Sequence, residues 1–262
     1  MEASGPISPI AISPTSTVSR RATDRHRHGP NYESLRCCGF ATVSAEKLDD
    51  RELSDRHVIH RAFDLEQELD PKPGRRWRSH TKLLIDSTDQ LTRVSHGPYH
   101  QSKDYNHDDG GEQRLFRAIG EDVLTSRTLD YLIRFTARVA RRTVPDVFER
   151  EGAAGVGLHM ISYRPGADGP AFSSPVWRHR DDEPFVAVIL CGLSANLGGG
   201  DNLIFPGDGK ERIISHAFKL RTPFEMLLLT NTQSWHAVTP MYSTDGAPAR
   251  RDVLLITFQE LA

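Results

Sequence analysis

The spacing of apolar and polar positions changes near Gly157 and predicts two different regions. From that residue onward, short apolar and β-branched segments recur at intervals of about ten residues and are separated by turn residues, which is typical of a β sandwich or barrel. The predicted strands are GLHMISYRP (157–165), PFVAVILCG (184–192), DNLIFPG (201–207), RIISHAFKL (212–220), FEMLLLTN (224–231), WHAVTPM (235–241) and RDVLLITF (251–258). We therefore expect a mainly β protein with a jelly-roll core formed by residues 155–260.

Earlier in the chain the apolar residues follow a helical period. Ser126 is a residue type that caps helices, and the apolar positions after it recur at helical spacing. The predicted buried face consists of Leu129, Leu132, Ile133, Thr136 and Ala140. Pro145 ends this helix or begins a new turn. Residues 45–70 predict a further amphipathic helix, whereas residues 35–44 and 80–86 predict strands.

The remaining segments set the expected domain boundaries. Residues 1–30 are rich in Ser, Thr, Pro and Arg, and we predict that they form a disordered tail. Residues 31–262 are expected to form a single domain, whose flanking helices lie mainly within residues 45–150. The glycines Gly198–Gly200 do not follow the strand-to-helix pattern of a phosphate-binding loop, and we interpret them as a tight turn.

Composition narrows the class of protein. The 262 residues carry a net charge of −2, which gives no general attraction to nucleic acid or to an anionic membrane surface. No apolar run reaches the ~18 residues of a membrane span, and the first twenty residues contain no secretory signal pattern. The three cysteines form no recognisable disulfide framework. We expect a cytoplasmic protein that acts on a small molecule, and its oligomeric state is not predicted.

One charged cluster is a candidate metal site. In an extended segment His179 and Asp181 project on the same face, because residues two apart share a side of a strand. His236, in another predicted strand, supplies a third ligand. Two histidines and one carboxylate form the facial triad of non-haem Fe(II) oxygenases. Because histidine must be neutral to bind a metal, we expect metal affinity to fall below about pH 6.5.

An arginine at the head of the last predicted strand complements this triad. Arg251 precedes a strongly apolar segment, where a guanidinium is costly unless it meets an anion. A diacid such as 2-oxoglutarate can chelate a metal with one end and accept two parallel hydrogen bonds from Arg251 with the other. The alternative for Arg251 is a salt bridge with Asp252 or Glu225.

Several segments resemble a known family. HRDDEPFVAVIL (179–190), GGGDNLIF (198–205), WHAVTPM (235–241), RRDVLLITF (250–258) and the polar loop YHQSKDYNHDDGGEQRLF (99–116) are similar to the 2-oxoglutarate/Fe(II) dioxygenases of the L-isoleucine 4-hydroxylase type. The resemblance covers about residues 35–258. It differs at Asp201, Asn202 and Phe205, and in the acidic pair Asp182–Glu183, which leaves the family's substrate preference in doubt.

The resemblance implies a double-stranded β-helix, cupin-like core and hydroxylation of a free amino acid. It implies Fe(II), 2-oxoglutarate and O2 as cofactor and co-substrates, with His179, Asp181 and His236 as ligands and Arg251 on the distal carboxylate of 2-oxoglutarate. Arg250 is the alternative if the motif is displaced by one residue. Related halogenases lack the carboxylate ligand, so Asp181 favours hydroxylation. The iron centre carries the chemistry, without a separate acid or base residue.

Substrate contacts are predicted in two places. The polar loop contributes Gln101, Tyr105 and Asn106, and the strand before the metal motif contributes His159 and Arg164. Two other function classes remain open at this point. One is a cupin-type hydrolase or isomerase with zinc or manganese, and the other is a binding module without catalysis. A role in secondary metabolism is the expected context of a hydroxylated amino acid.

Overall fold

The computed structural model describes residues 29–65, 67–107, 110–149, 152–205, 207 and 213–261. The predicted tail, residues 1–30, lies outside the described residues except for its last two positions.

The described helices all precede the β-rich half of the chain, as the periodicity predicted. They are α1 (Tyr32–Cys38), the 3₁₀ turn η1 (Ala45–Lys47), α2 (His57–Leu65), α3 (Glu121–Leu124), α4 (Arg127–Thr143) and α5 (Asp146–Glu149). The strands before them or among them are β1 (Phe40–Val43), β2 (Glu68–Leu69), β3 (Arg76–Asp86), β4 (Leu91–Arg93), β5 (Tyr99–His100) and β6 (Gln113–Arg114).

The later strands form the rest of the core. They are β7 (Ala153–Tyr163), β8 (Phe185–Leu193), β9 (Leu197–Gly199), β10 (Asn202–Phe205), β11 (His216–Phe218), β12 (Met226–Thr230), β13 (Trp235–Val238), β14 (Met241–Ser243) and β15 (Arg251–Gln259). The main sheet is antiparallel, in the order β1-β12-β8-β15-β7-β3-β2, with β4 also paired to β3. The smaller sheets are β11-β10-β13, β14-β9 and β5-β6. The prediction of a mainly β protein with flanking helices is confirmed.

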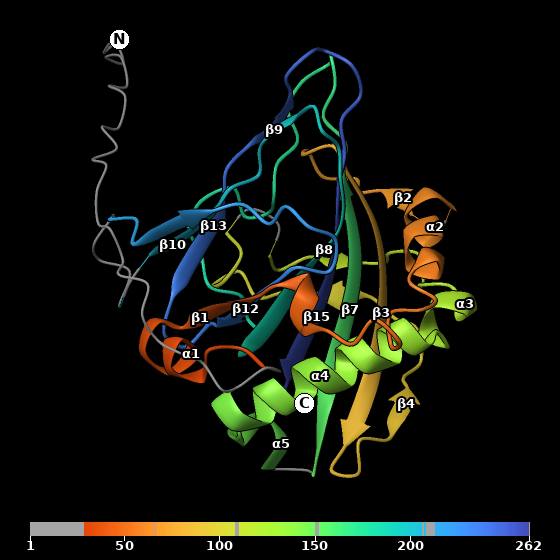
Figure 1. The fold of residues 1–262 in the computed structure, drawn as a ribbon, viewed down its shortest axis with the longest axis vertical. Coiled ribbons are helices and arrows are strands. Elements are labelled where there is room, and N and C mark those ends of the chain that lie inside the picture. The colour runs from red at the N-terminus through yellow and green to blue at the C-terminus, as the bar shows by residue number, and fades with distance from the viewer. Residues whose placement is uncertain are drawn as a thin grey trace.

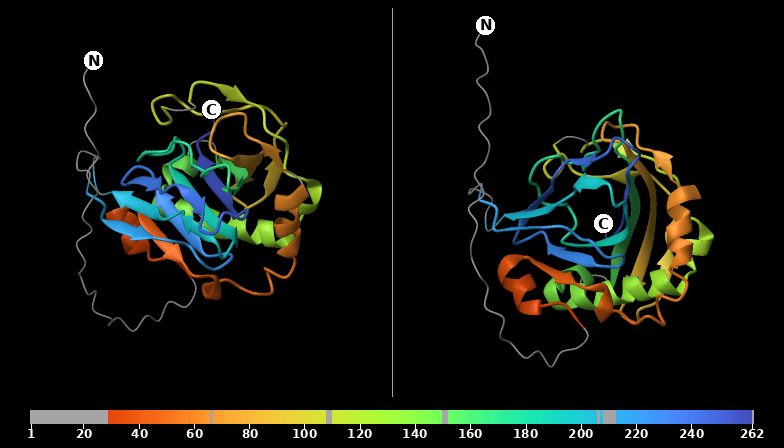
Figure 2. Two further views of the ribbon diagram at one scale, coloured as in Figure 1. Left: turned by 90° about the horizontal axis from the view of Figure 1, so that it is seen from above. Right: turned by 45° about the horizontal axis from the view of Figure 1, so that its top comes forward.

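The main sheet is buried on both faces. Figures 1 and 2 show α2 and α4 on its outer side and the strands β10 and β13 on its inner side. On β15, Leu254, Ile256 and Phe258 belong to the apolar cluster that includes the helices, whereas Val253 belongs to the cluster between the sheets. This alternation follows from the two-residue period of a strand. Every second residue of β7 and β15 therefore faces the interior between the sheets.

Helix α4 confirms the predicted pattern. The Ser126 hydroxyl accepts a hydrogen bond from the Leu129 backbone N–H at 3.2 Å, which satisfies one of the amide groups left free at a helix start. The buried residues of the helix include all five that were predicted to share its face. They pack against the outer face of the main sheet and keep that face dry.

Three local predictions need correction. The segment 35–44 is not one strand, because Asn31 caps helix α1 and Gly39, with φ of 74°, ends it before β1 begins. Within the segment 45–70 the described α-helix is α2 alone. The triple glycine is not a turn, since Gly198 and Gly199 belong to β9. Gly199 has φ of 68°, and a Cβ there would lie 1.8 Å from the Pro240 carbonyl oxygen, so only glycine permits this strand contact.

Candidate metal centre and substrate cavity

Two backbone hydrogen bonds bring the predicted histidines together. The His179 N–H donates to the His236 carbonyl oxygen at 2.8 Å, and the His236 N–H donates to the His179 carbonyl oxygen at 2.9 Å. His236 lies on β13, while His179 and Asp181 lie in the link that leads into β8. This short antiparallel bridge sets the two imidazole centroids 4.3 Å apart. The site therefore depends on pairing between segments that are distant in sequence.

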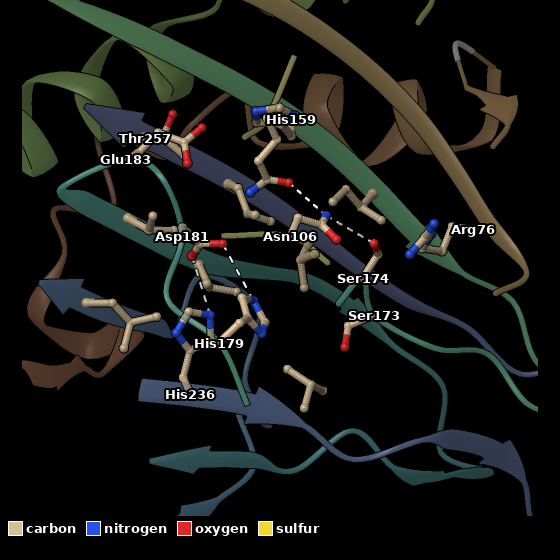
Figure 3. A pocket seen from close by; sticks show the side chains of 18 of the residues that line it. Arg76, Asn106, His159, Ser173, Ser174, His179, Asp181, Glu183, His236 and Thr257 are labelled. Carbon is tan, nitrogen blue, oxygen red and sulfur yellow. Dashed lines mark hydrogen bonds and ion pairs between the residues drawn. The ribbon is translucent and has the colours of Figure 1, made fainter. Parts of the chain in front are cut away.

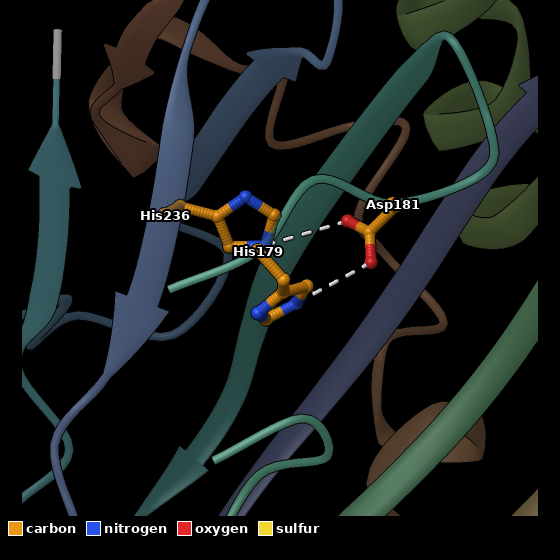
Figure 4. A group of neighbouring side chains, drawn as sticks. All are labelled: His179, Asp181 and His236. Atoms are coloured by element: carbon orange, nitrogen blue, oxygen red, sulfur yellow. Dashed lines mark ion pairs between the residues drawn. The ribbon is translucent and has the colours of Figure 1, made fainter. Parts of the chain in front are cut away.

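Asp181 completes the cluster. Its Oδ1 lies 3.6 Å from His179 Nε2, and its Oδ2 lies 3.4 Å from His236 Nε2. One ligand atom from each residue lies within 4.8 Å of the others, and Figure 4 shows the three side chains converging. His179 Nδ1 is 2.8 Å from the Trp177 carbonyl oxygen. Since a carbonyl only accepts, Nδ1 carries the proton, and the Nε2 lone pair is directed toward the cluster.

The charge state of the cluster suits a divalent metal. Burial lowers the pKa of His236 to about 4, with a further decrease from His179 and a partial offset from Asp181. Burial raises the pKa of Asp181, but His236, His179 and a hydrogen bond from Asn231 outweigh it and lower this pKa to about 2. Neutral imidazole and ionised carboxylate are the forms that bind first-row metals, so the donor set fits Fe(II). The low pKa of His236 keeps its imidazole neutral at neutral pH, as metal binding requires.

Arg251 lines the same cavity as the triad. Its side chain is 2% exposed, and its Nε and Nη2 have no hydrogen-bond partner among the described residues. Both predicted salt bridges are absent from this part of the chain, because Asp252 pairs with Arg250 at 2.7 Å and Glu225 accepts from the backbone N–H groups of residues 221 and 222. Burial lowers the pKa of Arg251, partly offset by Tyr163 and Asp201. A buried guanidinium with free donors is built to receive an anion.

Three of the five predicted substrate residues line this cavity. Gln101, Asn106 and His159 are 6%, 1% and 3% exposed. The Asn106 amide donates to Gln101 Oε1 at 2.8 Å and to Ser174 Oγ at 3.3 Å, which fixes the orientation of the loop side chains. In Figure 3, Asn106 lies beside Asp181 and above His179 and His236, and His159 lies higher still.

The other two predicted substrate residues lie outside this cavity. Tyr105 is 40% exposed and lines an outer hollow together with Trp177, which is 60% exposed. Arg164 donates to the Phe63 carbonyl oxygen at 3.0 Å, and its guanidinium lies 4.6 Å from the Trp77 ring centroid. The reason is the strand period: Tyr163 faces the cavity, so Arg164 faces the opposite side. Neither residue is retained as a substrate contact.

Sequence reasoning missed a further set of cavity residues. They are Arg76 and Arg78 on β3, Arg114 on β6 and Tyr99 on β5. Glu183, which the sequence singled out only as half of an acidic pair, lines the cavity as well. Glu183 is 5% exposed, and burial, followed by the charge of Asp181, raises its pKa to about 8. The signal was present in the alternation of Arg76, Arg78 and His80. It was overlooked because the predicted strand, residues 80–86, starts later than the observed strand, which begins at Arg76.

A family model described as 2OG-Fe dioxygenase matches residues 64–257. The chain belongs to the 2OG-Fe dioxygenase family. It is an enzyme that uses Fe(II), 2-oxoglutarate and O2, and the donor set at residues 179, 181 and 236 agrees with this requirement. Membership of this family excludes the two function classes that the sequence left open, the cupin-type hydrolase or isomerase and the binding module without catalysis.

Two curated relatives of this dioxygenase have names that specify an amino-acid substrate. L-isoleucine-4-hydroxylase from Bacillus thuringiensis is 34% identical over 223 residues, which cover 84% of this chain and 90% of the relative. 3(1)-hydroxy-L-isoleucine 4-dioxygenase from Pantoea ananatis (strain AJ13355) is 34% identical over 197 residues, which cover 73% of this chain and 76% of the relative.

Solved structures support the fold. The crystal structure of IDO from Bacillus thuringiensis has a TM-score of 0.75 at 27% identity and covers 88% of this dioxygenase and 98% of that chain. A bsmA homologue from Methylobium petroleophilum PM1 also has a TM-score of 0.75, at 23% identity, over 87% and 91% of the two chains. The double-stranded β-helix core is confirmed. Within the described part of the chain, no helix has the length and apolar character needed to cross a membrane.

Proposed function

We propose that this dioxygenase hydroxylates an unactivated C–H bond of a free L-amino acid, consuming 2-oxoglutarate and O2 and releasing succinate and CO2. The observation that supports it most is the shared cavity, in which a His-Asp-His cluster and the unpaired guanidinium of Arg251 lie on facing elements. The curated relatives, both named for isoleucine substrates, support an amino acid as the acceptor.

In this proposal His179, Asp181 and His236 hold Fe(II), and Arg251 binds the distal carboxylate of 2-oxoglutarate. When bound, the iron supplies the O2 and electron chemistry that amino-acid side chains lack. The Trp177 carbonyl oxygen fixes the tautomer of His179. Apolar side chains of β8, β12 and β15 line the cavity and exclude water, which strengthens the charge interactions of Arg251 inside it.

The binding partners and the cellular location of the protein remain predictions from its composition. We propose a small-molecule substrate, no nucleic-acid or membrane partner, and a cytoplasmic location, on the grounds of the net charge of −2 and the sequence patterns described above.

The test is a screen for succinate release over the common amino acids, with Fe(II), ascorbate and 2-oxoglutarate and with mass detection of a product that has gained one oxygen atom. We expect Asp181→Ala to abolish both products. The matched control is Asp182→Ala, since Asp182 is exposed and is not part of the ligand cluster. Absence of succinate with every amino acid for the wild type contradicts the proposal.

A further inference from the structure

Two arginines on the β3 side of the cavity form a second cationic site. Arg78 and Arg114 are 7% and 6% exposed, and both line the cavity that contains the triad. Their guanidinium carbons lie 5.7 and 5.5 Å from the Tyr99 ring centroid and 4.5 and 5.5 Å from that of Phe116. The aromatic rings hold the two guanidinium groups in place without neutralising their charge. The site is therefore preorganised and positive.

Among the described residues, the positive charge around Arg78 exceeds the negative charge that pairs with it. Two arginines share the buried carboxylate of Asp70, whose Oδ2 lies 3.2 Å from Arg76 Nη2 and 3.6 Å from Arg78 Nη1. The other polar partner of Arg78 is His159, whose Nδ1 lies 3.2 Å from Arg78 Nη2 and accepts from it. Burial lowers the pKa of His159 well below its usual value, so this imidazole is neutral. Arg78 Nε is buried without a hydrogen-bond partner among the described residues.

This site is separate from the one assigned to 2-oxoglutarate. In the strand register, Arg251 on β15 pairs with Tyr163 on β7, which pairs with Arg76 on β3. Arg78 belongs to the next inward-facing row, opposite Ile161. The backbones of β15 and β3 are two strand spacings apart, about 10 Å. Arg251 and Arg78 therefore approach the cavity from opposite sides of β7, and each has room for its own anion.

We propose that Arg78 and Arg114 bind the α-carboxylate of the amino-acid substrate. This inference rests on the proposed hydroxylation of a free amino acid and assigns the residues that recognise its α-carboxylate. A planar carboxylate accepts paired hydrogen bonds from guanidinium groups, which an amide or an ester cannot match in charge. The substrate class is amino acids with a free α-carboxylate, and it excludes α-amides, esters and amino acids held as thioesters on a carrier.

The test compares L-isoleucine with L-isoleucinamide, or whichever common amino acid releases most succinate with its own α-amide. Binding is measured by anaerobic calorimetry on the protein loaded with Fe(II) and 2-oxoglutarate, and KM values are measured separately. We expect the wild type to bind the acid about 10- to 100-fold more tightly than the amide. Arg78→Met and Arg114→Met should weaken acid binding by a similar factor, leave amide binding unchanged, and leave the KM for 2-oxoglutarate within about two-fold.

Two further variants separate binding from structure. Arg78→Lys keeps the charge but loses the paired donors, so it should restore part of the acid preference. Arg117→Met is the matched control, because Arg117 is exposed on the segment after β6. It should behave as the wild type.

The outcomes distinguish the two proposals. A wild type that binds acid and amide equally, or a folded Arg78→Met that keeps the acid preference while the wild type hydroxylates the amino acid, overturns this inference alone. If no amino acid releases succinate from the wild type, the proposed function and this inference fail together.

Discussion

Replacing Arg251 by Met separates the stability of the protein from its affinity for 2-oxoglutarate. Without the co-substrate, the wild type buries a guanidinium whose Nε and Nη2 lack partners. An unsatisfied buried group costs about 1–3 kcal/mol, and replacing a buried charge by an apolar side chain of similar size is often stabilising. We therefore expect Arg251→Met to raise the free energy of unfolding of the ligand-free protein by about 1–3 kcal/mol.

The same substitution should abolish stabilisation by 2-oxoglutarate. At a concentration of 100 times Kd, a ligand adds about 2.7 kcal/mol, which corresponds to roughly 5–10 °C in Tm for a chain of this size. Loss of the paired, charge-assisted hydrogen bonds should raise the KM for 2-oxoglutarate by about 100-fold. Scanning calorimetry with Mn(II), with and without 2-oxoglutarate, measures the first effect, and succinate release measures the second.

Arg250→Met is the control, because Arg250 forms ion pairs with Asp64 and Asp252 outside the cavity. It should lower the stability of the ligand-free protein and keep the full shift with 2-oxoglutarate. If Arg251→Met is instead the destabilised variant and still shows the full shift, the assignment of the guanidinium is wrong.

Three other predictions concern the metal, the helical layer and the small sheet. His236→Ala should remove Fe(II) from the purified protein, whereas His216→Ala, exposed on β11, should not; equal metal content by elemental analysis would exclude histidine ligation. Asp55 accepts hydrogen bonds from the first backbone amides of α4, and although burial raises its pKa, these bonds lower it overall. The contribution of Asp55 to the free energy of unfolding is therefore present above the pKa of the unfolded state, and it is lost as pH falls through the pKa of the folded state. In thermal melts, Asp55→Asn should lower Tm at pH 7, and this decrease should become smaller below about pH 4. Gly199→Ala should cost about 2 kcal/mol or more in urea unfolding, since its φ is positive and its Cβ position is blocked; an unchanged midpoint would refute the close strand contact.

The residues of the His-Asp-His cluster could be predicted from the sequence because part of the pattern that identifies them is local. His179 and Asp181 share a face through their two-residue spacing, and the combination of His236 and Arg251 with them indicated one kind of site. The tautomer of His179 and the low pKa of His236 could not be predicted, since both depend on a backbone bridge and on burial.

The cavity residues that the sequence did not predict are placed by pairing between strands that are distant in sequence. Arg78 enters the cavity because β3 pairs along nearly the whole of β7, and no local pattern specifies that pairing. The error at Arg164 came from the same source, because one step along the strand decides which face a side chain occupies. Helix α1 was missed for a local reason: Asn31 and Gly39 are ordinary cap residues whose signal was overlooked.

The most direct test of the central claim is the molar ratio of succinate to hydroxylated amino acid formed by the wild-type protein with Fe(II), O2 and 2-oxoglutarate. A dioxygenase whose cavity holds both the co-substrate on Arg251 and the amino acid beside the triad should form the two products in equal amounts. Succinate without a hydroxylated amino acid, or a hydroxylated product that forms without 2-oxoglutarate, would contradict the account.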